Sequence, residues 1–146
     1  MSVSRGVLTI EDQPQIAISE APSTTFESML NGVRSEVGAN PVSYESRLGS
    51  AARRHANDMH ANDFFSHTGS DNSDVGLRVR ETGYRHRYVG ENIAKGQQSE
   101  ASVLDDWQDS TGHRKNNENP EFEHFGLAKA GSGRDLYWVL VLADPL

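Results

Sequence analysis

The chain contains no cysteine among its 146 residues, so it forms no disulfide and its sequence carries no mark of a redox compartment. Positive charge is also scarce: 14 Lys and Arg stand against 21 Asp and Glu, for a formal net charge of −7 and a pI near 5.3. Nucleic acids and anionic membranes are bound by clustered basic surfaces. The acidic balance therefore argues against both as partners.

The one concentration of basic residues lies between positions 78 and 87. It falls across the end of a predicted helix and the segment after it, where charged side chains ordinarily face water. We interpret the whole cluster as a solvated helix and loop rather than as a binding surface. Its members are Arg78, Arg80, Arg85, His86 and Arg87.

Long apolar runs are missing as well, and no stretch is long enough to span a bilayer. The N-terminus lacks the apolar region of about 7 to 15 residues that marks a signal peptide, so we expect either a cytosolic protein or one whose export signal has been removed. The length fits one domain. Residues 1–23, with Pro14 and Pro22, are typical of a loosely ordered leader, which leaves residues 24–146 as the folded unit.

Apolar spacing within residues 24–146 predicts an α+β domain. Helical periodicity alternates with shorter extended runs, and the last run is so continuously apolar that it should be the central strand of an antiparallel sheet. Trp107 should be buried against that sheet. The expected helices are 24–38, 48–63, 74–81 and 99–107, and the expected extended segments are 40–44, 88–94, 124–130 and 136–143.

Three segments carry the residues best suited to a site: His67 in Phe-Phe-Ser-His-Thr-Gly-Ser, Glu91 in Gly-Glu-Asn-Ile-Ala, and His113 in Trp-Gln-Asp-Ser-Thr-Gly-His-Arg. Each lies at an expected element end, where side chains converge on clefts. Two imidazoles and a carboxylate suit a divalent metal such as Zn²⁺, with His67 and His113 as ligands, and they equally suit acid/base chemistry without one. Alternatively each has a structural role, as a cap or in a turn.

These three motifs, in this order, resemble the bacterial branch of the CAP superfamily, the SCP-like domain of cysteine-rich secretory proteins, antigen 5 and pathogenesis-related proteins. The resemblance covers about Phe26 to Ala143. It implies a three-layer α-β-α sandwich, with helices on both sides of a small antiparallel sheet, and a cleft lined by His67, Glu91, His113 and Ser110. Disulfide-rich members carry a second glutamate three residues after the helix tryptophan. Here that position is Ser110, which weakens the transfer of metal affinity or catalysis.

The other polar candidates rank lower. Asn92 follows Glu91 on one extended segment and should point to the opposite face, where it would secure the neighbouring loop. His55 lies on the apolar face of its helix and is expected in the core, while His60 and His86 should be outside the site. His124 is a weaker candidate for the border of the cleft. No His-Asp relay supports Ser66 or Ser110 as a nucleophile.

Two classes of function follow from the resemblance and the site residues. The first is a monomeric binding module, extracellular or periplasmic, whose cleft takes a small ligand, lipid or peptide. The second is a metal-assisted, peptidase-like hydrolase in which His67 and His113 hold the metal and Glu91 is the general base. The missing carboxylate at Ser110 favours the binding module over an enzyme.

Overall fold

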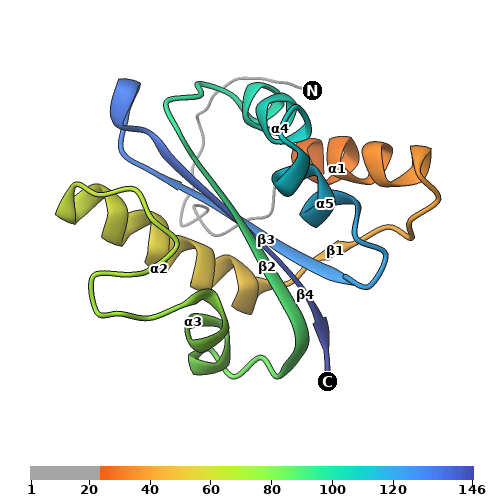
Figure 1. Cartoon of the computed structure of the whole chain (residues 1–146), viewed down its shortest axis with the longest axis horizontal. Helices are drawn as coiled ribbons and strands as arrows, with labels where there is room; N and C mark the ends of the chain where they lie inside the picture. The colour runs from red at the N-terminus through yellow and green to blue at the C-terminus, as the bar shows by residue number, and fades with distance from the viewer. Residues whose placement is uncertain (1–23) are drawn as a thin grey trace, which may run out of the picture.

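A computed structural model describes residues 24–146; the predicted leader, residues 1–23, lies outside the described residues. Helices, single or in consecutive pairs, separate the strands along the described part of the chain (Figure 1). The helices are α1 (Thr24–Glu36), α2 (Ser46–Asn62), α3 (Val75–Glu81), α4 (Glu100–Gln108), α5 (Thr111–Glu118) and the short 3-10 helix η2 (Gly133–Asp135). The strands are β1 (Ser43–Tyr44), β2 (His86–Lys95), β3 (His124–Ala130) and β4 (Tyr137–Pro145).

The four strands form one sheet in the order β1-β3-β4-β2. β4 pairs antiparallel with β3 and with β2, which confirms it as the central strand. The expectation of a wholly antiparallel sheet is wrong, because β1 pairs with β3 in parallel through Ser43 and Tyr44. No hairpin joins these two strands, and the long intervening chain leaves their relative direction free.

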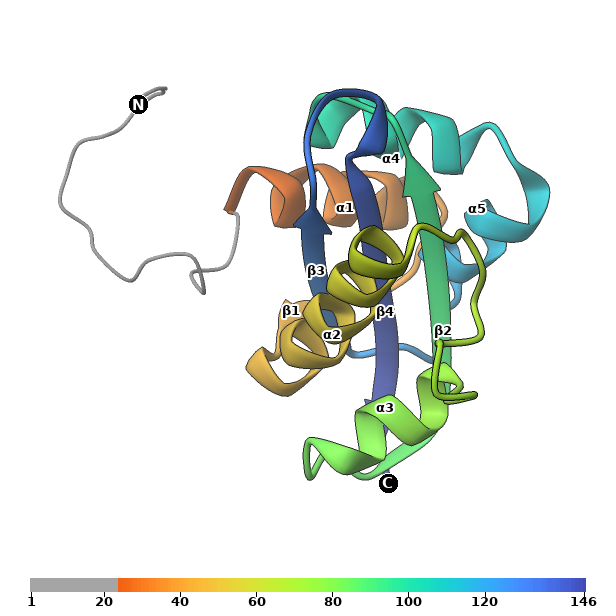
Figure 2. The ribbon, with the colours of Figure 1, turned by 90° about the vertical axis from the view of Figure 1, so that its left-hand side faces the viewer.

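Both faces of β4 are buried, because side chains alternate along a strand and helices cover each side. Trp138 packs into a core with α1 and α4, and its neighbour Tyr137 packs into a second core with α2 and α3. Figure 2 shows α2 and α3 crossing one face of the sheet, with α1 and α4 on the other. This is the predicted three-layer α-β-α sandwich.

Local sequence explains where the helices begin and how closely they pack. Asp74 caps α3 by accepting from the Leu77 amide, and Ser99 caps α4 by accepting from the Ser102 amide. Gly126 of β3 lies against the backbone of α2 at Gly49, where a Cβ atom would overlap it. The close contact between α2 and the sheet therefore requires glycine at position 126.

Helix α1 carries a buried charge that matters for the site. Val37, within the predicted helix 24–38 but beyond the end of α1, is 54% exposed, whereas Arg34 is fully buried. The Arg34 guanidinium donates to the main-chain oxygens of Asn117 and Asn119 at the end of α5. A buried arginine at a helical apolar position cannot be recognised without its partners.

Trp107 is 1% exposed, and its Nε1 donates to the main-chain oxygen of Ile93 at 3.1 Å. We expect Trp107→Ala to cost about 3 to 5 kcal/mol, because it opens a large cavity between α4 and the sheet and leaves that oxygen without its donor. Urea unfolding measures this loss. A cost below about 1 kcal/mol would show that the indole contributes little to the core.

Candidate functional site

Three of the predicted site residues belong to β2, an edge strand of the sheet, and to segments that flank it: Glu91, His67 and His113. Glu91 is on β2 itself, and its side chain is 2% exposed. His67 comes from the segment between α2 and α3, and its Nδ1 contacts Glu91 Oε1 at 2.7 Å. A carboxylate accepts, so Nδ1 carries the proton and Nε2 remains for other contacts. Because the His67 side chain is 59% exposed, a buried acid holds an accessible imidazole.

The second oxygen of Glu91 is bound by Arg78, whose Nη2 donates to Oε2 at 2.9 Å and to the main-chain oxygen of His67 at 3.0 Å. Arg78 Nη1 donates to the main-chain oxygen of Ser73 at 2.8 Å. One guanidinium therefore ties together α3, the His67 segment and β2. Both side chains of the Arg78–Glu91 pair are buried.

This arrangement corrects the interpretation of the basic cluster as solvated. Arg80, Arg85 and Arg87 are exposed, but Arg78 is 1% exposed. It lies on the inner face of α3 beside Val79, where its charge is compensated by Glu91. An arginine is ordinarily exposed to water, so residue type alone predicted an exposed side chain. The acid that compensates its charge is 13 positions away in the sequence and could not be identified as its partner.

His113 approaches from α5, on the other side of β2. Its main-chain oxygen accepts from Asn92 Nδ2 at 3.1 Å, and its half-buried imidazole makes no recorded hydrogen bond to Glu91. Nδ1 is buried and has no hydrogen-bond partner within residues 24–146. Burial lowers the pKa of His113, and the charge of His67 lowers it further. The structure thus brings His67 and Glu91 into direct contact and places His113 within electrostatic reach of His67.

Ser110 and Asn92 have different relations to the predicted cleft. Ser110 is the N-terminal cap residue of α5, yet its hydroxyl makes no capping bond. Asn92 is fully buried and faces α5, which confirms that it points away from Glu91. It was correctly expected to secure the adjoining segment.

Two other histidines, His55 and His124, have different surroundings and different hydrogen-bond partners. His55 is fully buried in α2, and its Nε2 lies 2.6 Å from the main-chain oxygen of Ser66, directly before His67. Burial lowers the pKa of His55. His124 instead pairs with the hydroxyl of Tyr84 through Nδ1 at 2.7 Å. The prediction that His55 lies in the core is confirmed. Its hydrogen bond to the segment directly before His67 was not predicted.

The donor set does not fit a three-ligand metal centre. Catalytic zinc sites ordinarily use three protein ligands and an open position. Here both Glu91 oxygens are hydrogen bonded, one of them to a guanidinium whose positive charge opposes a second cation. Among residues 24–146 there is no group of three or more His, Cys, Asp or Glu side chains arranged to hold a metal.

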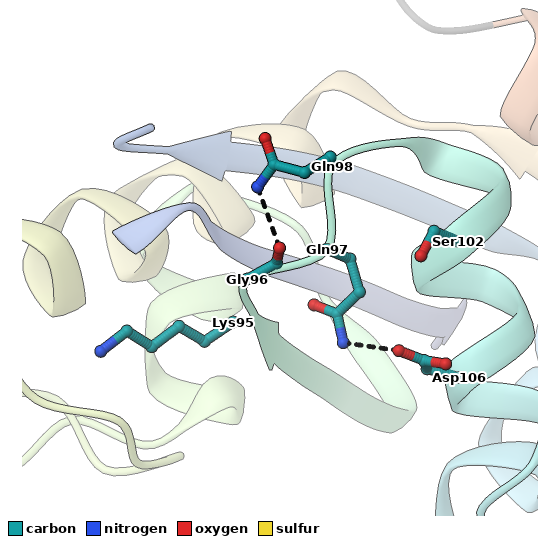
Figure 3. Close-up of a pocket in the computed structure, with 6 residues that line it drawn as sticks. All are labelled: Lys95, Gly96, Gln97, Gln98, Ser102 and Asp106. Carbon is teal, nitrogen blue, oxygen red and sulfur yellow. Dashed lines mark hydrogen bonds between the residues drawn. The ribbon is translucent and has the colours of Figure 1, made fainter. Parts of the chain in front are cut away.

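A separate hollow of about 490 Å³ lies where β2 runs into α4 (Figure 3). Gln97 spans it by donating from Nε2 to Asp106 Oδ2 at 2.9 Å. None of His67, Glu91 and His113 lines this hollow. Its lining residues are Lys95, Gly96, Gln97, Gln98, Ser102 and Asp106.

Comparison with known proteins identifies the class to which this fold and site belong. The sequence model of the Cysteine-rich secretory protein family, CAP, matches residues 27–142. The chain therefore belongs to the CAP family. No helix in the described part of the chain is long and apolar enough to cross a membrane.

Two similar proteins come from Bacillus subtilis (strain 168). The uncharacterized protein YkwD is 33% identical over 105 residues, which cover 72% of this chain and 41% of YkwD. The uncharacterized membrane protein YlbC is 25% identical over 118 residues, which cover 81% of this chain and 34% of YlbC. The chain thus spans less than half the length of either relative.

Solved structures support the same fold. An extracellular protein containing an SCP domain from Bacillus anthracis has a TM-score of 0.74 at 25% identity, over 82% of this chain and 39% of that chain. An outer surface protein from Borrelia burgdorferi has a TM-score of 0.77 at 16% identity, over 84% of this chain and 91% of that chain. Both bacterial structures share the fold of this chain, and the Bacillus anthracis protein contains an SCP domain.

The Arg78–Glu91 pair yields a stability prediction with a matched control on the same helix. Arg78→Met leaves a buried carboxylate without its cation and should cost about 3 to 5 kcal/mol in urea unfolding. Arg80→Met, at an exposed position, should change stability by no more than about 0.5 kcal/mol. Adding Glu91→Leu to Arg78→Met should recover most of the loss. Failure of that recovery would show that the cost does not come from the unpaired acid.

The His67–Glu91 contact should stabilise the protein most at mildly acidic pH. The hydrogen bond from His67 to Glu91 raises the pKa of His67 above its ordinary value of 6.5. Because the folded pKa exceeds the unfolded one, this stabilisation is complete below about pH 6.5 and is lost as the pH rises through the raised pKa. His67→Ala should therefore destabilise the protein more at pH 5.5 than at pH 8.5, by up to about 1 kcal/mol since the ring is exposed. An equal loss at both values would contradict this assignment.

Proposed function

We propose that this CAP domain is a monomeric binding module that works outside the cytoplasm, secreted or associated with the cell envelope, and that takes a small ligand, lipid or peptide at His67, Glu91 and His113. The extracellular character of the SCP-domain protein from Bacillus anthracis supports this location. The observation that supports a binding role is that both carboxylate oxygens of Glu91 are already hydrogen bonded, one to His67 and the other to Arg78.

A carboxylate whose two oxygens both accept hydrogen bonds is better suited to orienting a neighbouring side chain than to removing a proton. Glu91 stabilises the protonated imidazole of His67 and is itself shielded from water. The group offered to a ligand is then His67 Nε2, which donates when the ring is protonated. Phe65, two residues earlier, is 52% exposed. This combination suits a ligand with an anionic or acceptor group beside an apolar portion.

Metal-assisted hydrolysis has less support from the same atoms. A general base must reach the water that it activates, and the Glu91 side chain is 2% exposed and already accepts a hydrogen bond at each oxygen. No recorded contact links the Ser110 hydroxyl to a histidine, and Ser66 Oγ accepts from the Thr68 amide. The Arg78 cation on Oε2 of Glu91 would also repel a metal ion placed beside that carboxylate.

The test is an NMR titration of the histidine ring resonances with laurate and with a short apolar peptide, at pH 6.0 and 8.0. We expect the His67 signals to shift on titration with one of these probes, more strongly at pH 6.0, where more imidazole is protonated. His67→Ala should abolish saturable binding. His60→Ala, at an exposed position on α2, is the matched control and should leave it intact. Binding that is unchanged by His67→Ala would overturn the proposed site.

Calorimetry with Zn²⁺ alone distinguishes the two classes of function. We expect weak binding or none, because two imidazoles without a free carboxylate form an incomplete ligand set. A tight, stoichiometric Zn²⁺ site would fall in affinity as the pH drops through the histidine range and would be lost in a His67→Ala, His113→Ala double variant. Such a result would favour the hydrolase.

A further inference from the structure

Helix α5, which carries His113 into the proposed site, contains no large apolar residue. Its sequence is Thr-Gly-His-Arg-Lys-Asn-Asn-Glu, and its one buried residue is Asn117. A surface helix ordinarily stays in place by burying an apolar stripe. Because α5 has none, hydrogen bonds must supply most of its attachment to the sheet.

Those hydrogen bonds converge on Asn92, the fully buried neighbour of Glu91. Its Nδ2 donates to the main-chain oxygen of His113 at 3.1 Å and to Asn117 Oδ1 at 2.9 Å. Its Oδ1 accepts from Asn116 Nδ2 at 2.8 Å. One amide on β2 therefore contacts three residues of α5, including the turn that presents His113.

The network continues beyond Asn92 without a gap. Asn117 Nδ2 donates to Gln108 Oε1 at 2.8 Å, and the main-chain oxygen of Asn117 accepts from Arg34 at 2.8 Å. At Gly90, an added Cβ atom would come within 3.0 Å of Asn116 Oδ1, so α5 packs directly against the β2 backbone. Such satisfied polar networks are cooperative, and the removal of one member leaves several buried groups unpaired.

We infer that Asn92 is the positioning residue of His113: it docks α5 on the edge of β2, and without its amide α5 leaves the site as a unit. This inference rests on the proposed function for the role of His113, whereas the docking is a property of the free protein. The two halves of the site are thereby held independently. Arg78 and Glu91 hold His67, and Asn92 holds His113.

Hydrogen exchange followed by NMR in the free protein tests the inference with Asn92→Asp. The substitution keeps Oδ1 and the side-chain shape but replaces the donor with an acceptor that faces two oxygens. We expect the α5 amides at 114–118 to exchange at least about tenfold faster than in the unmodified protein, while the α4 amide of Val103 changes by less than about threefold. The His113 ring resonances should shift toward those of a solvated histidine, while those of His67 stay in place.

The matched control is Asn31→Asp. Asn31 is a partly buried asparagine of α1 whose amide bonds to the Val42 main chain: Nδ2 donates to the Val42 oxygen at 2.9 Å and Oδ1 accepts from the Val42 amide at 2.8 Å. Asn31→Asp should leave the ratio of exchange rates between the α5 and α4 amides unchanged. If Asn92→Asp prevents folding, Asn116→Ala removes the donor to Asn92 Oδ1 and to the Glu91 main-chain oxygen and should give a smaller change confined to α5. Unchanged α5 protection, or equal acceleration of α4 and α5, would overturn the inference. A failure to find a ligand would affect only the proposed function.

Discussion

The buried ion pair between Arg78 and Glu91 is the interaction on which the site depends. Burying two charges is costly, and this pair is tolerated because further hydrogen bonds satisfy it: Arg78 donates to Glu91, to the His67 backbone and to the Ser73 backbone. These contacts join an edge strand, a short helix and an irregular segment. The same atoms therefore stabilise the layer and orient His67.

Side chains close to the candidate site also cover the open edge of β2. An open sheet edge exposes main-chain groups that would pair with other chains. Trp107 Nε1 donates to the Ile93 oxygen, and Asn116 Nδ2 donates to the Glu91 oxygen. Side chains from α4 and α5 thus occupy positions that a further strand would take. The candidate site therefore lies at an edge that is covered by side chains rather than by a further strand.

Much of the fold could be predicted because its helices and strands bury regular apolar patterns. The stripe of α2 from Leu48 to Met59, the central strand β4 and the burial of Trp107 all follow from periodicity. Parallel pairing of the two-residue β1 could not be predicted, since nothing in Ser43 or Tyr44 encodes strand direction. The sandwich itself was anticipated by resemblance to CAP domains.

The site was predictable in its residue types but not in its connections. His67, Glu91 and His113 were recognisable from their motifs, whereas the roles of Arg78 and Arg34 depend on partners far along the chain. Buried arginines have the sequence appearance of solvated ones, because burial is decided by compensating groups that periodicity does not report.

Different interactions consequently stabilise the two sides of the site. On one side, the apolar face of α2 packs against β3 and β4, and the loop carrying His67 is bound to that rigid layer through His55 and Arg78. On the other, α5 lies on β2 through amide hydrogen bonds and the Arg34 guanidinium. Water that enters beside α5 can itself pair with the freed amide groups, whereas it cannot replace the apolar contacts of α2. If the proposed ligand needs room, we therefore expect the His113 side to yield before Glu91 and His67 do.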